Sequence, residues 1–185
     1  TDVLQRPRFL AITEFGPRAL IYHEGRRHRI TRIDVPRVER ADGVFDIAAT
    51  RAKRCPACGH LHNVTDGTIV DTCESCGATL GGEMTSLLRL QKVHTRPVDR
   101  ISSDEEERQR QGYEIISGYR FARRDGKLSR RIAKVTDPAG EALATLQFGD
   151  AATLWRMNLG WRRRQVKEQH GFVLDTEKGR WATNQ

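Results

Sequence analysis

Cys55-Pro56-Ala57-Cys58 and, fourteen residues later, Cys73-Glu74-Ser75-Cys76 hold all four cysteines of the chain and decide how this part of it folds. Each pair places two sulfurs on one tight turn, and two such turns supply the tetrahedral four-sulfur shell of a structural zinc site, with bonds of about 2.3 Å. Gly59 and Gly77 follow directly, at the turn position that requires positive φ. The spacing therefore predicts a zinc ribbon over residues 55–82, with Cys55, Cys58, Cys73 and Cys76 as ligands of Zn²⁺.

Two other interpretations of the cysteines, as disulfides or as a redox motif, are less well supported by the sequence. Disulfides require an oxidising compartment, and the sequence shows no secretory pattern of a charged start and an apolar stretch. A thioredoxin-like motif comes once, at a strand-to-helix junction, whereas this chain has two CxxC pairs. His60 and His62 compete as ligands, but four thiolates already complete the shell. Both histidines are therefore expected to be solvated loop residues.

The chain is basic, with a net charge of +8 that is unevenly distributed. Residues 55–82 contain no Lys or Arg, whereas residues 1–54 and 151–185 carry an excess of arginine. Arginine favours bidentate pairing with phosphate or carboxylate, so these flanks predict a polyanion or an acidic protein surface as partner. No apolar run approaches the roughly 18 residues of a membrane span. We expect no membrane partner, and the cysteine usage fits a cytoplasmic location.

Short apolar and β-branched runs, separated by turn signals, predict the fold class. We expect an α+β chain that is mostly β, an antiparallel β-rich sandwich or small barrel with the four-cysteine zinc ribbon inserted in it. Residues 9–13 are expected to form the first strand of a meander, and residues 86–94 another strand. One short helix is expected near 103–111, where Ser103 caps a run of acids and Gly112 stops it.

These elements divide the chain into three segments. An N-terminal β-meander and linker takes residues 1–54, the ribbon insertion takes 55–82, and a β-rich body takes 83–185. We expect the three to form one composite domain. The ribbon buries too little apolar surface to fold unaided, so metal binding is expected to supply its folding free energy.

The sequence carries no motif of a known catalytic chemistry. The Walker pattern fails at Gly126-Lys127, which Leu128 follows, and neither GxSxG nor HExxH occurs. A zinc deaminase needs Pro directly before a CxxC, where this chain has Arg54 and Thr72. Because four cysteines leave no open coordination position, we expect a structural metal and a chain that is not itself an enzyme.

Two arginine clusters are candidate nucleic-acid contacts. In the first, Trp161 precedes Arg162, Arg163 and Arg164, a grouping that can bind phosphates and stack on a base. The alternative for this cluster is a solvated turn whose arginines pair with the acids of residues 104–107. The second cluster flanks the Asp125-Gly126 turn and consists of Arg123, Arg124, Arg130 and Arg131.

Four stretches resemble the zinc-binding C-terminal domain of MrfA-type superfamily 2 helicases, formerly a domain of unknown function. They are Arg8–Pro17 with Gly25, the four-cysteine segment, Arg100–Tyr113, and Ala152–Arg164 with Gly171-Phe172. The last two are the more specific, since CxxC pairs recur in unrelated ribbons. One position departs from the pattern: family members often have Gly after the Pro of the first stretch, and here Arg18 stands there.

The resemblance implies a module that follows the two motor domains of a DNA helicase or translocase in a longer polypeptide. Such modules serve DNA repair or phage defence of the DISARM kind. The resemblance further implies that the four cysteines bind zinc and that ATP chemistry belongs to the motor region. We therefore expect a non-catalytic accessory domain that supports DNA binding or motor assembly. Two alternatives stay open, namely a protein-docking module that uses the ribbon and an RNA- or ribosome-associated ribbon protein.

Charge separates the expected roles of the ribbon and its flanks. Zn²⁺ with four thiolates carries a net charge of about −2. This adds to three ribbon acids, Asp66, Asp71 and Glu74. A phosphate backbone is repelled by such a segment, so we expect the ribbon to pack or dock while the arginines of the flanks face nucleic acid.

Overall fold

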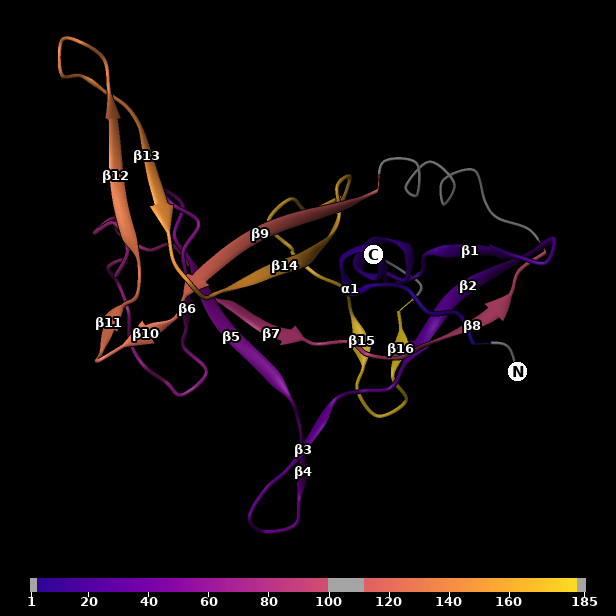
Figure 1. Ribbon diagram of the computed structural model, residues 1–185. Helices are drawn as coiled ribbons and strands as arrows, with labels where there is room; N and C mark the ends of the chain where they lie inside the picture. Colours follow the sequence, from indigo (N-terminus) through magenta and orange to yellow (C-terminus); the bar gives the residue numbers. More distant parts are fainter. Residues whose placement is uncertain (1–2, 100–111, 183–185) are drawn as a thin grey trace. The chain divides into compact units, whose positions relative to one another are not determined.

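Strands dominate the structure, a computed structural model that describes residues 3–99 and 112–182 (Figure 1). Within these residues it contains sixteen strands and one helix, which confirms the expected mostly β fold. The strands form small sheets of two, three or five members, and none of the described sheets closes into a barrel. The helix expected near 103–111 lies outside the described residues.

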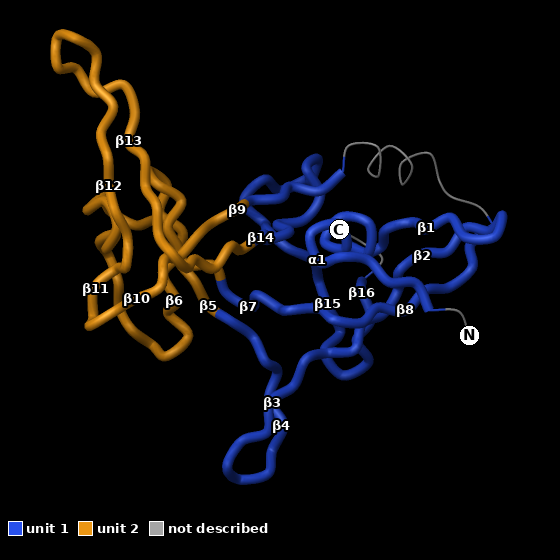
Figure 2. The backbone as a smooth tube through the Cα atoms, viewed as in Figure 1, with its two compact units in different colours: residues 1–50, 85–116, 156–185 blue, residues 51–84, 117–155 orange. Residues whose placement is uncertain are grey.

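The chain forms two compact units, each assembled from segments that are distant in sequence (Figure 2). Unit 1 comprises residues 1–50, 85–116 and 156–185, and unit 2 comprises residues 51–84 and 117–155. The four-cysteine segment therefore shares a unit with the chain between residues 117 and 155. Partners that stabilise the ribbon come from that later part of the sequence.

A five-stranded sheet organises unit 1. Its strands are β1 (Leu20–His23), β2 (Arg26–Ile33), β8 (Val93–Pro97), β15 (Leu174–Asp175) and β16 (Arg180–Trp181). The order is β1-β2-β16-β15, β8 also pairs with β2, and neighbouring strands run antiparallel. Ile30 and Ile33 of β2 are both buried although they are three positions apart, because the register shifts between Ile30 and Arg32. Such a bulge adds one residue and returns the strand to the same face.

Aromatic side chains hold the segments of unit 1 together. The rings of Tyr113 and Trp161 stack with their centroids 4.6 Å apart, and Phe172 meets both of them edge-on. The Tyr113 hydroxyl donates a hydrogen bond of 2.8 Å to the carbonyl of Pro17. Arg18, the next residue, has a φ of 63°, the left-handed conformation that glycine adopts without strain.

The expected first strand at residues 9–13 is wrong, because these residues lie in helix α1 (Arg8–Glu14). A short apolar run is compatible with either element, and here contacts distant in sequence decide. The Arg156 guanidinium lies over the Phe9 ring at 4.3 Å and donates to the Phe9 carbonyl, while Asn158 donates to the carbonyl of Ile12. Helix α1 has seven residues and is too short to cross a membrane. The described residues contain no helix that is long and apolar enough to do so.

Other strands complete unit 1 and lead into unit 2. Strands β3 (Arg37–Glu39) and β4 (Phe45–Ile47) form a small hairpin. Strand β9 (Tyr113–Phe121) pairs with β14 (Ala152–Trp161), and the chain passes between the units within both strands. The single strand expected at 86–94 is wrong, because four residues separate β7 (Met84–Leu88) from β8, which begins at Val93. The two halves separate because β7 joins β5 whereas β8 joins β2.

Unit 2 contains two hairpins and the larger part of a three-stranded sheet, whose strand β7 belongs mostly to unit 1. The sheet places β5 (Ala49–Arg54) between β6 (Leu61–Asn63) and β7. The hairpins are β10 (Arg123–Arg124) with β11 (Lys127–Leu128), and β12 (Arg131–Thr136) with β13 (Ala142–Phe148). Asp125 and Gly126 both have positive φ in the turn between β10 and β11, as the Asp-Gly pair predicts.

Candidate metal centre

The two CxxC turns of unit 2 have the same backbone geometry. In the first, the Cys55 amide donates to the His60 carbonyl at 2.8 Å, and the Gly59 amide donates to the Cys55 carbonyl at 2.9 Å. In the second, Cys73 donates to Ala78 and Gly77 to Cys73, both at 2.8 Å. Gly59 and Gly77 have φ values of 78° and 77°, so the expected positive φ is confirmed at both. Each turn is thus closed by its own backbone hydrogen bonds.

These turns bring the four cysteine sulfurs together. The Sγ atoms of Cys55 and Cys76 are 3.6 Å apart, those of Cys58 and Cys73 are 3.7 Å apart, and all four lie within 4.8 Å of one another. A metal with four sulfur bonds of about 2.3 Å in a tetrahedron requires sulfurs about 3.8 Å apart, whereas a disulfide requires about 2.05 Å. All four cysteines are free. The predicted ligand set therefore forms a candidate metal site.

Burial and backbone hydrogen-bond donors shift the pKa values of the cysteine thiols in opposite directions. Cys55 and Cys73 are buried in a small cluster with Leu80, whereas Cys76 is exposed. Burial acts to raise the pKa of the Cys55 thiol, but the amides of Cys58 and Ala57 donate to its sulfur and lower that pKa to about 7. Burial raises the pKa of Cys73 to about 12. A metal at this site would displace the proton from Cys73 and stabilise the thiolate instead.

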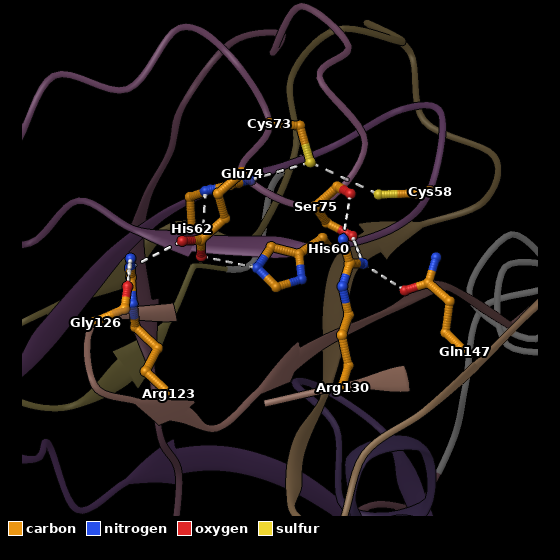
Figure 3. A network of polar contacts seen from close by, with 10 residues as sticks. All are labelled: Cys58, His60, His62, Cys73, Glu74, Ser75, Arg123, Gly126, Arg130 and Gln147. Atoms are coloured by element: carbon orange, nitrogen blue, oxygen red, sulfur yellow. Dashed lines mark hydrogen bonds and ion pairs between the residues drawn. The ribbon is translucent and has the colours of Figure 1, made fainter. Parts of the chain in front are cut away.

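His60 and His62 are not the solvated loop residues expected from the sequence. His60 is fully buried and His62 is 5% exposed. The Nε2 of His62 lies 3.4 Å from Sγ of Cys73, and the Nε2 of His60 lies 3.0 Å from Oε1 of Glu74 (Figure 3). Alternation of side chains over residues 60–62 puts Leu61 on one side of the chain and the two histidines on the other. The sequence signal for their burial is the His-x-His pattern that directly follows the first CxxC-Gly.

His60, His62 and Glu74 bring three further ligand-type atoms within 4.8 Å of one another. These three side chains could hold a metal ion of their own, and they also contact the second CxxC turn. Burial lowers the pKa of His62, so its ring is neutral, and its Nε2 shares a hydrogen bond with the Cys73 sulfur. Burial acts to raise the pKa of Glu74, but the hydrogen bond from His60 and the charge of Arg123 outweigh it and lower that pKa. Glu74 is therefore an ionised acceptor inside the second turn.

Basic side chains from outside residues 55–82 neutralise and hold the ribbon. Arg123 pairs with Glu74 at 2.8 Å, and Lys53 pairs with Asp71 at 3.2 Å. Arg130 donates to both the carbonyl and the hydroxyl of Ser75, and to the side chain of Gln147 at 2.6 Å (Figure 3). The negative charge expected on the ribbon is thus partly compensated by its own unit.

The second predicted arginine cluster therefore divides into two pairs. Arg123 and Arg130 are engaged with the second CxxC turn, as described above. Arg124 and Arg131 are exposed on β10 and β12. A nucleic-acid role for these four residues stays a prediction, with Arg124 and Arg131 the more accessible.

The first predicted cluster lies in unit 1. Trp161 is 7% exposed, stacked on Tyr113, which leaves its ring little surface for a base. Arg162 donates to the Tyr113 carbonyl at 3.2 Å, and Arg164 pairs with Glu114 at 2.7 Å. Arg163 is exposed. The pairing of these arginines with residues 104–107 lies outside the described residues, and their phosphate contact stays a prediction.

Comparison with known proteins identifies no relative of this chain. No protein-family model matches the chain, and neither the curated proteins nor the solved structures contain a match. The assignment of the site therefore rests on its own geometry and chemistry.

Proposed function

We propose that this chain is a non-catalytic, zinc-stabilised accessory module that contacts nucleic acid. The observation that carries the proposal is the placement of four cysteine sulfurs at separations of 3.6 Å and 3.7 Å in two matched turns. Thiolate ligands in a tetrahedral arrangement favour Zn²⁺, and four of them leave no coordination position for a substrate. Zinc then stabilises the fold of unit 2.

Nucleic acid is the partner that the charge supports best. The chain carries a net charge of +8, and two of the three ribbon acids are paired within unit 2, Asp71 with Lys53 and Glu74 with Arg123. The remaining excess of arginine favours a phosphate backbone. The resemblance to the C-terminal domain of MrfA-type helicases extends this proposal to DNA and to a motor region in the same or a partner chain, in repair or phage defence.

Metal analysis of the purified protein tests the zinc assignment. We expect one zinc per chain, and replacement of zinc by cobalt should give the absorption of a tetrahedral thiolate complex. The Cys58→Ser variant should lose the metal, and its amides between residues 55 and 80 should exchange hydrogen faster than those of β2 in unit 1. A protein that holds no metal after purification under reducing, zinc-containing conditions would contradict the proposal.

Binding to labelled oligonucleotides tests the nucleic-acid partner. Anisotropy should show binding to single-stranded or duplex DNA that weakens with salt, with a logarithmic slope of about 0.7 per phosphate neutralised on a single strand. RNA of the same sequence is the comparison that separates a DNA module from an RNA-associated ribbon protein. Absence of binding to every oligonucleotide at low salt would leave only an assembly role.

A protein-docking role is the second candidate, and one observation favours it. On the β12–β13 hairpin, Ala133 lies opposite Leu146 and Val135 lies opposite Ala144. Opposite residues share a face, and on this face Val135 and Leu146 are 42% and 60% exposed. The double variant Val135→Ser/Leu146→Ser should abolish co-purification with a motor or partner subunit while oligonucleotide binding is unchanged, if docking is the function of this hairpin.

A further inference from the structure

The strand register of unit 1 gathers arginines on one face of the five-stranded sheet. Residues directly opposite each other in an antiparallel pair point to the same face, as do residues two apart on one strand. Arg29 lies opposite Arg96, and Arg32 lies opposite both His94 and Arg180. His94 and Arg96 are two apart on β8, which places both groups on one face in spite of the bulge in β2.

The opposite face of the same strands is the buried one. Ile30 is opposite Thr95 and Ile33 is opposite Val93, and both isoleucines are at most 2% exposed. The arginines therefore lie on the face opposite these isoleucines, where Arg32, Arg96 and Arg180 are exposed. Arg27 and Arg29 are half-buried, and the Nε of Arg29 is buried. Register places six basic residues on this face, here called the arginine face, and with them Asp175 opposite Arg180 and Leu20 opposite Arg29. The basic residues are Arg27, Arg29, Arg32, His94, Arg96 and Arg180.

Two arginines of this face lie directly opposite each other. Like charges directly opposite each other in a sheet are destabilising, and Arg32 faces Arg180 in this way. The side chains of Arg32, Arg96 and Arg180 are exposed, and none forms a hydrogen bond or ion pair within residues 3–99 and 112–182. Two acids lie beside them, Asp34, which pairs with His94 at 2.6 Å, and Asp175, opposite Arg180. A bound anion would relieve the repulsion.

An exposed aromatic ring completes the face. Tyr22 of β1 lies directly opposite Arg27, so it belongs to the same face, and it is 71% exposed. Arginines that contact phosphates beside an aromatic ring that stacks on a base are the elements of a single-strand binding surface. An acidic protein surface would use the arginines but has no need of the exposed ring.

We propose that the arginine face of β2, β8 and β16 binds the phosphate backbone of single-stranded nucleic acid, with Tyr22 stacking on a base. This inference rests on the proposed function and identifies the surface that carries it. The face joins arginines from positions 27 and 180, more than 150 residues apart in the chain, and so it is distinct from both arginine clusters visible in the sequence.

The first test removes three exposed charges. Arg32→Gln/Arg96→Gln/Arg180→Gln should lower the logarithmic salt slope on single-stranded DNA by about 2, so that raising salt from 50 to 200 mM weakens the wild type about twentyfold more than the variant. The control Arg8→Gln/Arg89→Gln/Lys167→Gln removes the same charge from exposed positions of unit 1 outside the face, and its slope should stay that of the wild type. Circular dichroism and zinc content verify that both variants are folded.

The second test addresses the aromatic ring. Tyr22→Ala should weaken binding to single-stranded DNA or RNA roughly tenfold and binding to duplex much less, because a paired base offers no free face for stacking. Phe45→Ala, which removes another exposed aromatic of unit 1, should leave both affinities unchanged. Parallel titrations with DNA and RNA of equal sequence show which of the two the face prefers.

The outcomes separate this inference from the proposed function. If the wild type binds oligonucleotides and the triple arginine variant binds them with the same slope, the arginine face is not the binding surface, although the proposed function stands. If equal losses occur in the control triple, a diffuse charge effect replaces the defined face. If the wild type binds no oligonucleotide at low salt, both proposals are overturned.

Discussion

The imidazole Nε2 of His62 lies 3.4 Å from Sγ of Cys73, inside the buried part of the metal centre. His62 is neutral because burial lowers its pKa, so the ring can serve as a hydrogen-bond donor to a thiolate without adding a full charge. Such outer partners orient metal ligands and reduce the negative charge that four sulfurs concentrate on one ion. The histidine therefore lies beside the candidate metal site, and we expect it to support the cysteines without being a ligand itself.

Replacement of His62 should weaken metal binding without abolishing it. We expect His62→Ala to lower the zinc affinity about 10- to 100-fold, because loss of an outer-shell hydrogen bond typically has an effect of this size. Competition with a coloured chelator measures the affinity directly. His170→Ala, at an exposed position of unit 1, is the control and should retain the wild-type value. Complete loss of zinc in His62→Ala would instead make the histidine a ligand.

Gly118 of β9 is predicted to be intolerant of a side chain. A Cβ at this position would lie 2.6 Å from Cγ of Leu61 and 3.1 Å from the Gly59 carbonyl oxygen. Leu61 is 1% exposed and cannot move aside, so Gly118→Ala should lower the free energy of unfolding by about 1–3 kcal/mol. Denaturant unfolding of the zinc-loaded protein gives this value. Gly81→Ala, where no atom lies within 4 Å of the added Cβ, should change it little.

We expect the main role of Arg130 to be structural, namely to hold the second CxxC turn. Arg130→Gln removes the donors that hold Ser75 in the second CxxC turn, and we expect faster release of zinc to a chelator. Arg124→Gln, at an exposed position of β10 in the same predicted cluster, should release zinc at the wild-type rate. If both variants keep their zinc equally well and both lose oligonucleotide affinity, the cluster serves nucleic acid, and its contact with Ser75 is incidental.

The thiol pKa values predict that zinc affinity rises with pH. Because the pKa values of Cys73, about 12, and of Cys76 are raised, both thiols keep their protons near neutral pH in the metal-free protein, and zinc must displace them. Two displaced protons give an affinity that rises about 100-fold per pH unit. Below the Cys55 pKa of about 7, a third proton makes the dependence steeper.

Calorimetry checks this proton release. Titration of zinc into the metal-free protein at pH 8, in buffers that differ in ionisation enthalpy, should report the release of at least two protons per metal. A binding heat independent of the buffer would show that the thiols are already ionised, in conflict with the buried state of Cys73.

Local sequence signals account for the metal ligands and for most strands. The CxxC spacing places four sulfurs correctly because each pair lies on one short turn closed by its own backbone bonds, which needs no distant partner. Strand β9 at Tyr113–Phe121 and the Asp125-Gly126 turn follow from alternation and turn chemistry in the same way. These features depend on residues within a few positions of one another.

Features that depend on contacts between distant segments could not be predicted from the sequence. Phe9 lies in a helix and not a strand because Arg156 and Asn158 engage its turn from almost 150 residues away. His60 and His62 are buried because the first CxxC turn packs against β9, where Tyr119 bridges to His60. The arginine face exists only because strand register aligns Arg32 with Arg180.

The candidate metal ligands, the mostly β character and the sign of the charge could all be derived from the sequence, since each follows from residue type and short-range spacing. The tertiary structure decided which histidines support the cysteines, which arginines are engaged with Ser75 and Glu74, and which remain on an open sheet face. The physical reason is that burial, pairing and register are properties of contacts between segments, and no local pattern encodes which segments will meet.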